Sequence, residues 1–293
     1  MRYLTGAGLI LLAGAVWSIQ GVLIRQLDEA GSWAVLFWRS LGTVPVLVLW
    51  IGPNRVLPAL RSVGMAGVVG GLGLVLAFGG AIVALQSTTV ANAMLLFSAS
   101  PFFAAVFGRV LLGEPVSLPT WGAILLALVG ILVMVGGIGQ IGGGQVLGTA
   151  AALISAAGFA GFTVTIRWGH VADSLPVVLL GGIFSTIAGA TAAVVSGQAL
   201  AVPLDEAALA FGMGTVTLTG GMYLYTKGSQ AVPAAQATLL SLVEVLLAPI
   251  WAWVFLRETL SANTALGGAV LLTAVTLNAA LGLRTARPKP NRP

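Results

Sequence analysis

The chain has 293 residues, of which 58% are hydrophobic and only 7% are charged, and its mean hydropathy is +1.04. Soluble domains carry about 25% charged residues, so this composition excludes a soluble globular enzyme. Cysteine is absent, which removes disulfides and thiolate metal ligands. The isoelectric point of about 10.5 is explained by the basic loops of a membrane protein, so no nucleic-acid partner is expected.

Apolar runs bounded by charged residues, prolines and turn residues predict ten membrane-spanning helices. Five of them cover about residues 4–26, 32–51, 62–85, 89–112 and 119–137, and the other five cover about residues 145–167, 174–196, 207–228, 233–256 and 262–283. The first apolar run continues to Ile24 and is too long for the core of a secretory signal, so we expect a retained helix. The predicted fold class is an all-α integral membrane protein in the lipid bilayer.

Basic residues set the predicted orientation. With the N-terminus inside, all Lys and Arg residues lie on the cytoplasmic side except Arg25, Arg39 and Arg257. Because Lys and Arg gather in cytoplasmic loops, we expect a multi-pass protein of the cell (inner) membrane with both termini in the cytoplasm. Residues 284–293 are rich in proline and basic residues and predict a disordered basic tail, for which a lipid-headgroup contact is the alternative.

The two halves of the chain repeat each other at an offset of 142 to 144 residues. Three pairs of positions carry the alignment: Trp17 with Phe159, Arg25 with Arg167, and Glu114 with Glu258. Each repeat holds five predicted spans, and because five is an odd number, the second copy is inverted in the membrane. We therefore predict a first repeat over residues 1–138, an inverted second repeat over residues 145–283, and a central cavity between them.

The sequence resembles EamA domains, which define the drug/metabolite transporter superfamily. The resemblance rests on Val90-Ala91-Asn92-Ala93 leading to Ser98-Ala99-Ser100-Pro101, on Leu-Gly-Glu at 112–114, on Trp121-Gly122, and on a similar run at 235–272. Arg39 also lies where such proteins often carry an arginine in the second helix. The resemblance implies an amino-acid exporter, most similar to the aromatic amino acid exporter branch.

Glu244 is the only acidic residue in the middle of a predicted span. It lies roughly 16 Å along a helix that begins near Pro233, close to mid-membrane, where a charge is costly. We predict that Glu244 faces the cavity and binds a substrate amine or carries a proton. The structural alternative is a protonated side chain that forms a hydrogen bond between helices.

Aromatic and polar residues share faces in the first and sixth predicted helices. Trp17 and Gln20 lie on one face of the first, and Phe159 and Thr163 lie on one face of the sixth. Such faces suit flat or apolar substrate groups, because aromatic rings stack on each other and a cation binds over an indole. Close helix packing is the alternative.

Four more helices contribute candidates. Tyr223 and Lys227 lie on a polar side of the eighth helix, where Lys227 either extends toward the membrane surface or gates the inner mouth by pairing with Asp173. Phe78 lies in a glycine-rich third helix, and Asn92 and Ser98 lie on the fourth. Arg39 is close to the outer end of the second helix, where reaching the surface or pairing with Asp28 or Glu29 explains it. The substrate-binding candidates are Trp17, Gln20, Phe78, Asn92, Ser98, Phe159, Thr163, Tyr223 and Glu244, and the gating or ion-pair candidates are Lys227 and Arg39.

These observations predict a secondary transporter that exports amino acids, with aromatic amino acids and other small organic metabolites as candidates, by alternating access. Proton-coupled efflux of cationic drugs or other metabolites through Glu244 is the alternative, and a passive channel is another. No enzyme, cofactor or metal site is expected, since His170 is the only histidine and a Walker A motif is absent. The expected partners are a small-molecule substrate and the lipid bilayer, with a monomer as the functional unit and an oligomer as the alternative.

Overall fold

The computed structural model describes residues 3–24, 26–87, 93, 96–134, 146–171, 173–256 and 262–285, and these ranges contain helices and no strand. In the first half the helices are α1 Tyr3–Ser18, α2 Gln20–Ile24, α3 Ser32–Ile51, η1 Pro53–Arg55, α4 Val56–Ser62, α5 Gly64–Ser87, α7 Ser100–Leu112 and α8 Leu118–Met134. In the second half they are α9 Val146–Trp168, α10 Leu175–Ser196, α11 Leu204–Gly212, η3 Met213–Leu218, α12 Thr219–Ser229, α13 Ala234–Ser241, α14 Val243–Leu256 and α15 Ala262–Thr285. Asn92, Arg25, Arg257, Glu258 and most of the 284–293 tail lie outside the described residues.

Six stretches of this bundle are long and apolar enough to cross a membrane: Tyr3–Ile24, Ser32–Ile51, Gly64–Ser87, Val146–Trp168, Leu175–Ser196 and Leu204–Ser229. Four shorter apolar helices cover Ser100–Leu112, Leu118–Val133, Ala234–Ala248 and Ala265–Asn278. Many large apolar side chains lie on the outer surface of the bundle, as expected for helices whose solvent is lipid. The protein is therefore a multi-pass, all-helical membrane protein, and the number of ten spans stays a prediction.

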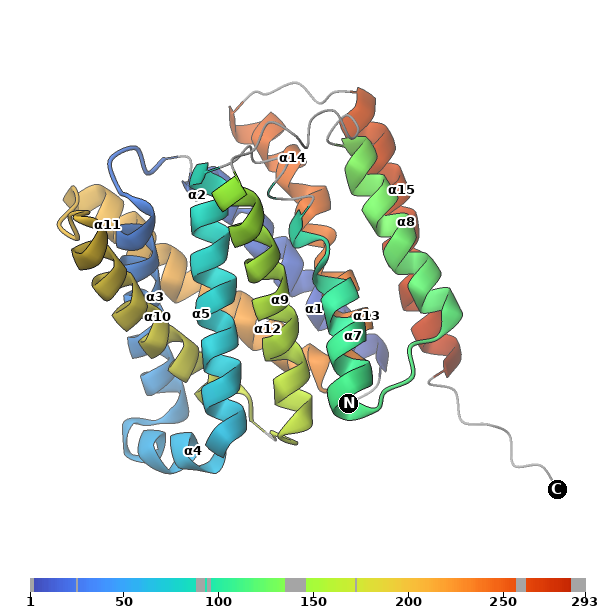
Figure 1. The fold of residues 1–293 in the computed structure, drawn as a ribbon, viewed down its shortest axis with the longest axis horizontal. Coiled ribbons are helices and arrows are strands. Elements are labelled where there is room, and N and C mark those ends of the chain that lie inside the picture. The colour runs from blue at the N-terminus through green and yellow to red at the C-terminus, as the bar shows by residue number, and fades with distance from the viewer. Residues whose placement is uncertain are drawn as a thin grey trace.

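Glycines bring helices from the two halves into direct backbone contact. A Cβ atom at Gly73 of α5 would lie 2.9 Å from the Gly158 carbonyl oxygen of α9, and a Cβ atom at Gly130 of α8 would lie 2.9 Å from the Gly267 oxygen of α15. The pairs α5 with α9 and α8 with α15 run side by side in Figure 1. Small residues that let helix backbones approach are the usual basis of helix packing in membranes.

Two spans predicted as continuous helices are broken. The first is interrupted at Ile19, between α1 and α2, and the ninth is interrupted at Leu242, between α13 and α14. Each break directly follows a serine whose hydroxyl bonds a carbonyl three residues back: Ser18 Oγ donates to Ala15 O at 2.6 Å and Ser241 Oγ to Thr238 O at 2.8 Å. Such bonds compete with the regular helical ladder, so each of these two predicted spans consists of two helices with a turn residue between them.

The eighth span also departs from a regular α-helix, because η3 is a π-helix between α11 and α12. Of the fourth predicted span, the structure describes Ala93, residues 96–99 and α7, with turn residues at Ser98 and Ala99 directly before α7. Broken and π-helical segments leave backbone groups free to bond side chains or ligands. These irregular segments surround the part of the bundle described next.

Candidate functional site

Three aromatic rings from three helices meet inside the bundle and are called the aromatic cluster below: Trp17 of α1, Phe159 of α9 and Tyr225 of α12. The ring centroids of Trp17 lie 5.7 Å from Phe159 and 5.6 Å from Tyr225, and Phe159 lies 4.9 Å from Tyr225. Trp17 is 8% exposed and Tyr225 is fully buried, whereas Phe159 is partly exposed. The structure thus brings together Trp17 and Phe159, the equivalent positions of the predicted repeats.

Hydrogen bonds fix one side of the aromatic cluster. The Thr163 hydroxyl donates to Phe159 O at 2.9 Å, and its oxygen lies 2.8 Å from the Tyr225 hydroxyl, which is then the donor of that pair. Thr163 was predicted as a site residue, whereas Tyr225 was missed, because it lies off the polar side of its helix that drew attention to Tyr223. The signal that could have identified Tyr225 was the presence of an aromatic residue and a threonine, Phe159 and Thr163, on the helix that packs against it.

The indole nitrogen of Trp17 has no hydrogen-bond partner among the described residues, although it is buried. Gly221 of α12 lies against this indole, since a Cβ atom there would approach Trp17 Cε2 to 2.7 Å. A buried donor without an acceptor is uncommon in a folded protein. A Cβ atom at Gly221 would fall closest to this nitrogen, so the Trp17 N–H is packed against α12.

Glu244 is the second residue of α14, directly after the break at Leu242. The side chain is partly exposed and forms no hydrogen bond or ion pair within the described part of the chain. Gly14 of α1 packs on this break: a Cβ atom there would lie 2.9 Å from Ser241 O and 3.3 Å from Glu244 N. The carboxyl group therefore lies at a helix N-terminus, which favours negative charge, beside the helix that carries Trp17.

Trp251 lies two turns beyond Glu244 on α14 and contacts α1 as well. Its indole nitrogen donates to Ser18 Oγ at 2.7 Å, the same hydroxyl that bonds Ala15 O at the break between α1 and α2. The two broken helices are thus joined by a direct hydrogen bond. The spacing of seven residues puts Trp251 on the same helix face as Glu244, and its link to the other break is not predictable from that spacing.

Arg39 lies inside the bundle, with Gln20 of α2 and Phe78 of α5 around its guanidinium, and these three residues are called the arginine cluster below. Arg39 Nη1 donates to Gln20 Oε1 at 3.2 Å, and Arg39 Cζ lies 5.3 Å from the centre of the Phe78 ring. The side chain is only 5% exposed. The expectation that it extends to the surface or pairs with Asp28 or Glu29 is therefore wrong.

The backbone around Arg39 is held against the π-helix η3. A Cβ atom at Gly214 would lie 2.8 Å from the carbonyl carbon of Arg39, and a Cβ atom at Gly42 would lie 3.0 Å from that of Phe211. Thr43 Oγ1 also donates to Gly214 O at 3.1 Å. The two glycines allow this close contact, because any side chain would separate the backbones.

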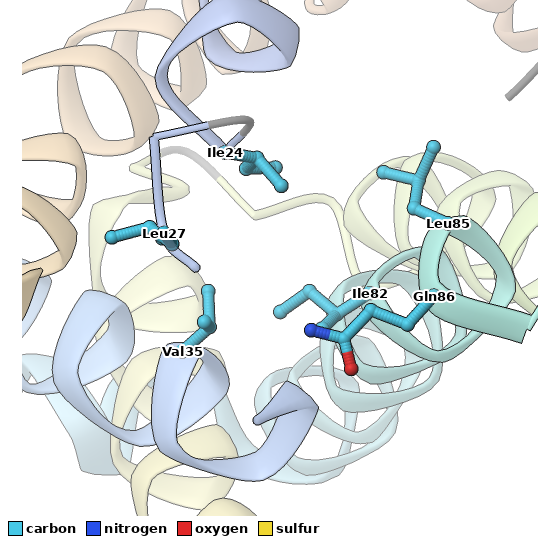
Figure 2. A pocket seen from close by; sticks show the side chains of 6 residues that line it. All are labelled: Ile24, Leu27, Val35, Ile82, Leu85 and Gln86. Carbon is cyan, nitrogen blue, oxygen red and sulfur yellow. The ribbon is translucent and has the colours of Figure 1, made fainter. Parts of the chain in front are cut away.

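A small pocket lies next to the arginine cluster, and Figure 2 shows the six side chains around it. It encloses about 40 Å³ and is lined by Ile24, Leu27, Val35, Ile82, Leu85 and Gln86. Three residues of the pocket each lie one turn from a member of the arginine cluster. Ile24 is four residues after Gln20 on α2, Ile82 is four residues after Phe78 on α5, and Val35 is four residues before Arg39 on α3. The pocket therefore lies about one helical turn from Arg39 on the same three helices.

The Asp28–Ala30 loop on the pocket side is held by Glu206. Its carboxylate accepts the backbone N–H groups of Asp28 and Glu29, both at 3.0 Å, and of Ala30 at 2.8 Å. Next to this loop, Ser32 Oγ donates to Gln86 Oε1. These contacts hold the loop beside the pocket residue Gln86, and sequence reasoning missed Glu206 because it begins a helix far away in the chain.

Lys227 and Tyr223 flank Tyr225 on α12 but make their contacts outside both clusters. Lys227 Nζ is 4.0 Å from Asp173 Oδ1 and 5.9 Å from the centre of the Tyr223 ring. Tyr223 stacks on Trp50, with ring centroids 4.6 Å apart. The structure contains the Lys227 to Asp173 pair proposed as a gate, while Tyr223 contacts a partly exposed surface ring rather than the aromatic cluster.

Ser98 is buried in the turn before α7, and Asn92 lies outside the described residues. Within the ranges that the structure describes, no group of three or more His, Asp or Glu side chains is placed to hold a metal ion. The described residues offer three kinds of groups for binding: the aromatic cluster, the carboxyl group of Glu244 and the buried guanidinium of Arg39. Such groups recognise a small charged molecule by contact and hydrogen bonding.

Known proteins resemble this chain over nearly its whole length. An uncharacterized transporter of Archaeoglobus fulgidus is 27% identical over 279 residues, which are 94% of this chain and 96% of that protein. The pseudopaline exporter CntI of Pseudomonas aeruginosa, from strains PAO1 and UCBPP-PA14, is 25% identical over 278 residues, which are 92% of this chain and 94% of that protein.

The fold is also known from a crystal structure that covers 97% of this chain and 99% of its own, with a TM-score of 0.79 and 18% sequence identity. The sequence profile of the EamA-like transporter family matches residues 4–136 and again residues 146–280. The family is one of transporters, and the named relatives are a transporter and an exporter of pseudopaline. Because the profile matches most of the chain in two consecutive segments, this protein belongs to the EamA-like transporter family.

Proposed function

We propose that this protein exports amino acids from the cytoplasm across the cell membrane by alternating access, with aromatic amino acids as the first class to test. The observation that carries the proposal is the meeting of the two broken helices, with unpaired Glu244 at one break and Trp17 two residues before the other. Discontinuous helices near the membrane centre form the solute sites of many secondary transporters. Glu244 binds the ammonium group of the solute, and the aromatic cluster contacts its side chain.

Contacts between the halves support an inverted duplication over residues 1–138 and 145–283. α5 packs on α9, and α12 packs on α1 in the corresponding way, as the Gly6 and Gly228 contacts indicate. α3 packs on α10 and α8 packs on α15, and each of these is a pair of equivalent helices. A two-fold axis in the membrane plane produces this pattern, and alternating access then consists of rocking one bundle against the other.

The arrangement of the chain ends supports the predicted orientation. The start of α1 and the end of α15 lie at the same end of the bundle, the lower one in Figure 1. Arg55, Arg61, Arg109 and Arg167 lie in or near helix ends on that side. Such a concentration is typical of the cytoplasmic face, so we place both termini in the cytoplasm of a cell whose inner membrane holds the protein.

Efflux of organic cations is the second candidate, and the unpaired Glu244 beside the indole of Trp17 favours it. A carboxylate and an aromatic face bind a quaternary or protonated amine without any need for a carboxylate on the solute. The two candidates differ in whether the solute needs an acidic group. Amino acids carry one, whereas cationic drugs do not.

The test is counterflow in liposomes that contain the purified protein. Liposomes are loaded with each unlabelled amino acid or organic cation in turn, and uptake of the labelled compound is followed with and without a pH gradient. Saturable uptake that is stimulated by internal amino acid supports the proposal. Counterflow of cations alone favours the second candidate, and flux that does not saturate identifies a passive pore and contradicts both.

A further inference from the structure

One edge of the Arg39 guanidinium group forms no hydrogen bond with the described residues. Its Nε and Nη2 atoms are buried and have no hydrogen-bond partner in the described part of the chain, and only Nη1 is bonded, to Gln20. No acidic side chain among the described residues pairs with it. A buried cation without a partner is strongly destabilising, so an isolated guanidinium here needs an explanation beyond packing.

The two free donors are those that bind a carboxylate side-on. Nε–H and Nη2–H lie parallel on one edge of the guanidinium fork, and this edge matches carboxylate geometry. Arg167 in the same protein gives the comparison: its Nε and Nη2 both donate to Glu114 Oε1, at 2.9 and 2.5 Å, while its Nη1 bonds two carbonyl groups. Arg167 is fully paired, whereas Arg39 has the same edge free.

The surroundings fit a monoanion that carries an apolar group. Phe78 covers one side of the guanidinium, and the neighbouring pocket is lined mainly by Ile24, Val35 and Ile82 with Leu27 and Leu85. A phosphate dianion would need further cations or donors, and Arg39 is the one cation in the described segments around this pocket. An apolar wall beside Arg39 favours an organic acid over an inorganic ion.

We propose that Arg39 and Gln20 form a carboxylate-binding subsite, in which the Nε and Nη2 edge of Arg39 holds the acidic group of the solute and the apolar pocket one turn away receives part of its body. The inference rests on the proposed function and deepens it, because it assigns the acidic group of the solute to Arg39. Gln20 positions the guanidinium through Nη1.

Binding is tested on the purified protein by thermal unfolding, without any need for transport. Four compounds at equal ionic strength serve as probes: 3-phenylpropionate, its uncharged amide, chloride and phosphate. A ligand that binds only the folded state raises the unfolding temperature in proportion to the logarithm of its concentration. We expect 3-phenylpropionate to raise it in the wild type and the other three compounds to leave it unchanged.

Variants assign the effect to Arg39. Arg39→Gln is expected to lose the shift, and Arg39→Lys, which keeps the charge but lacks the fork, is expected to need about tenfold more 3-phenylpropionate for half of it. Arg61→Gln, an exposed arginine at the end of α4, is the matched control and should behave as wild type. If Arg39→Gln does not fold, Arg39→Lys and Gln20→Leu carry the test, with a weakened response expected in each.

Three outcomes overturn the subsite: an equal shift with the amide, an equal shift with chloride or phosphate, or a wild-type response in Arg39→Lys. The first means apolar binding only, and the second means a general anion site. These results are separable from those of the counterflow assay. Arg39-dependent binding without amino-acid counterflow refutes the proposed transport but not the subsite, and counterflow with a wild-type response in Arg39→Lys refutes the subsite alone.

Discussion

Arg167 and Glu114 form an ion pair that joins the end of α9 to the end of α7, with 2.5 Å between Arg167 Nη2 and Glu114 Oε1. Arg167 Nη1 also donates to the carbonyl oxygens of Ser229, at 3.3 Å, and of Val232, at 2.9 Å. One arginine therefore ties together four helices, because Ser229 ends α12 and Val232 lies shortly before α13. The side chains of the pair are 26% and 28% exposed, so screening by water weakens the ion pair itself.

Removing either partner separates these contributions. We expect Glu114→Gln to cost about 1 kcal/mol of stability, the upper value for an accessible pair. Arg167→Gln should cost about 2 to 3 kcal/mol, because two carbonyl groups lose their donor as well. Thermal unfolding of the purified variants measures both, with Arg61→Gln as the exposed control. Equal losses in the two variants would mean that the carbonyl contacts contribute nothing.

Glu206 is expected to hold the Asp28–Ala30 loop by its carboxylate. Glu206→Ala leaves three backbone N–H groups without their acceptor, and we expect a loss of about 1 to 3 kcal/mol. Hydrogen exchange at residues 28–30 should become faster in this variant. Asp205→Asn, an exposed neighbour, is the control and should leave exchange at the loop as in the wild type. Unchanged exchange in Glu206→Ala would show that the three bonds do not order the loop.

Glu244→Gln tests the unpaired carboxyl group at the break in the ninth span. The amide cannot carry a proton or attract an ammonium group as a charge, so counterflow should fall at least about tenfold, and any dependence on an imposed pH gradient should disappear. Glu29→Gln, an exposed acid outside the helices, controls for general loss of charge. Wild-type rates and wild-type pH dependence in a folded Glu244→Gln protein would end the substrate or proton role.

Gly221→Ala tests whether the position of Trp17 matters. The new methyl group would overlap the indole, with a Cβ atom 2.7 Å from Trp17 Cε2, so the ring must move and counterflow should fall. Overpacking of this kind costs about 1 to 3 kcal/mol, which thermal unfolding also detects. Gly220→Ala is a close control, because nothing lies within 4 Å of a Cβ atom there. If both alanine variants transport equally well, the aromatic cluster does not contact the solute.

Much of the fold was predictable, because a bilayer demands long apolar helices. The six longest spans agree with the predicted ranges within a few residues. The breaks at Ile19 and Leu242 were not predictable from composition, because no proline or glycine stands at either position. Ser18 and Ser241 precede them, and serine inside a helix is too common to signal a break by itself.

The candidate site was predictable in part. The repeat offset and helical spacing brought Trp17, Phe159 and Thr163 to one place, as the structure has them. Arg39 was misjudged because its distance from the helix end says nothing about which side of the helix faces the bundle. That depends on Gly42 and Gly214, whose contacts join helices far apart in the sequence, and a single sequence does not reveal such pairs.

The backbone contact between α3 and η3 has an energetic consequence for recognition. Because the peptide that carries Arg39 is immobilised by its neighbours and Gln20 holds one guanidinium nitrogen, a ligand meets a cation whose conformational entropy has already been lost during folding. Preorganisation of this kind lowers the cost of association. Selectivity at this position then depends on the shape of the arriving molecule and on the removal of its hydration shell, since the protein has little left to rearrange.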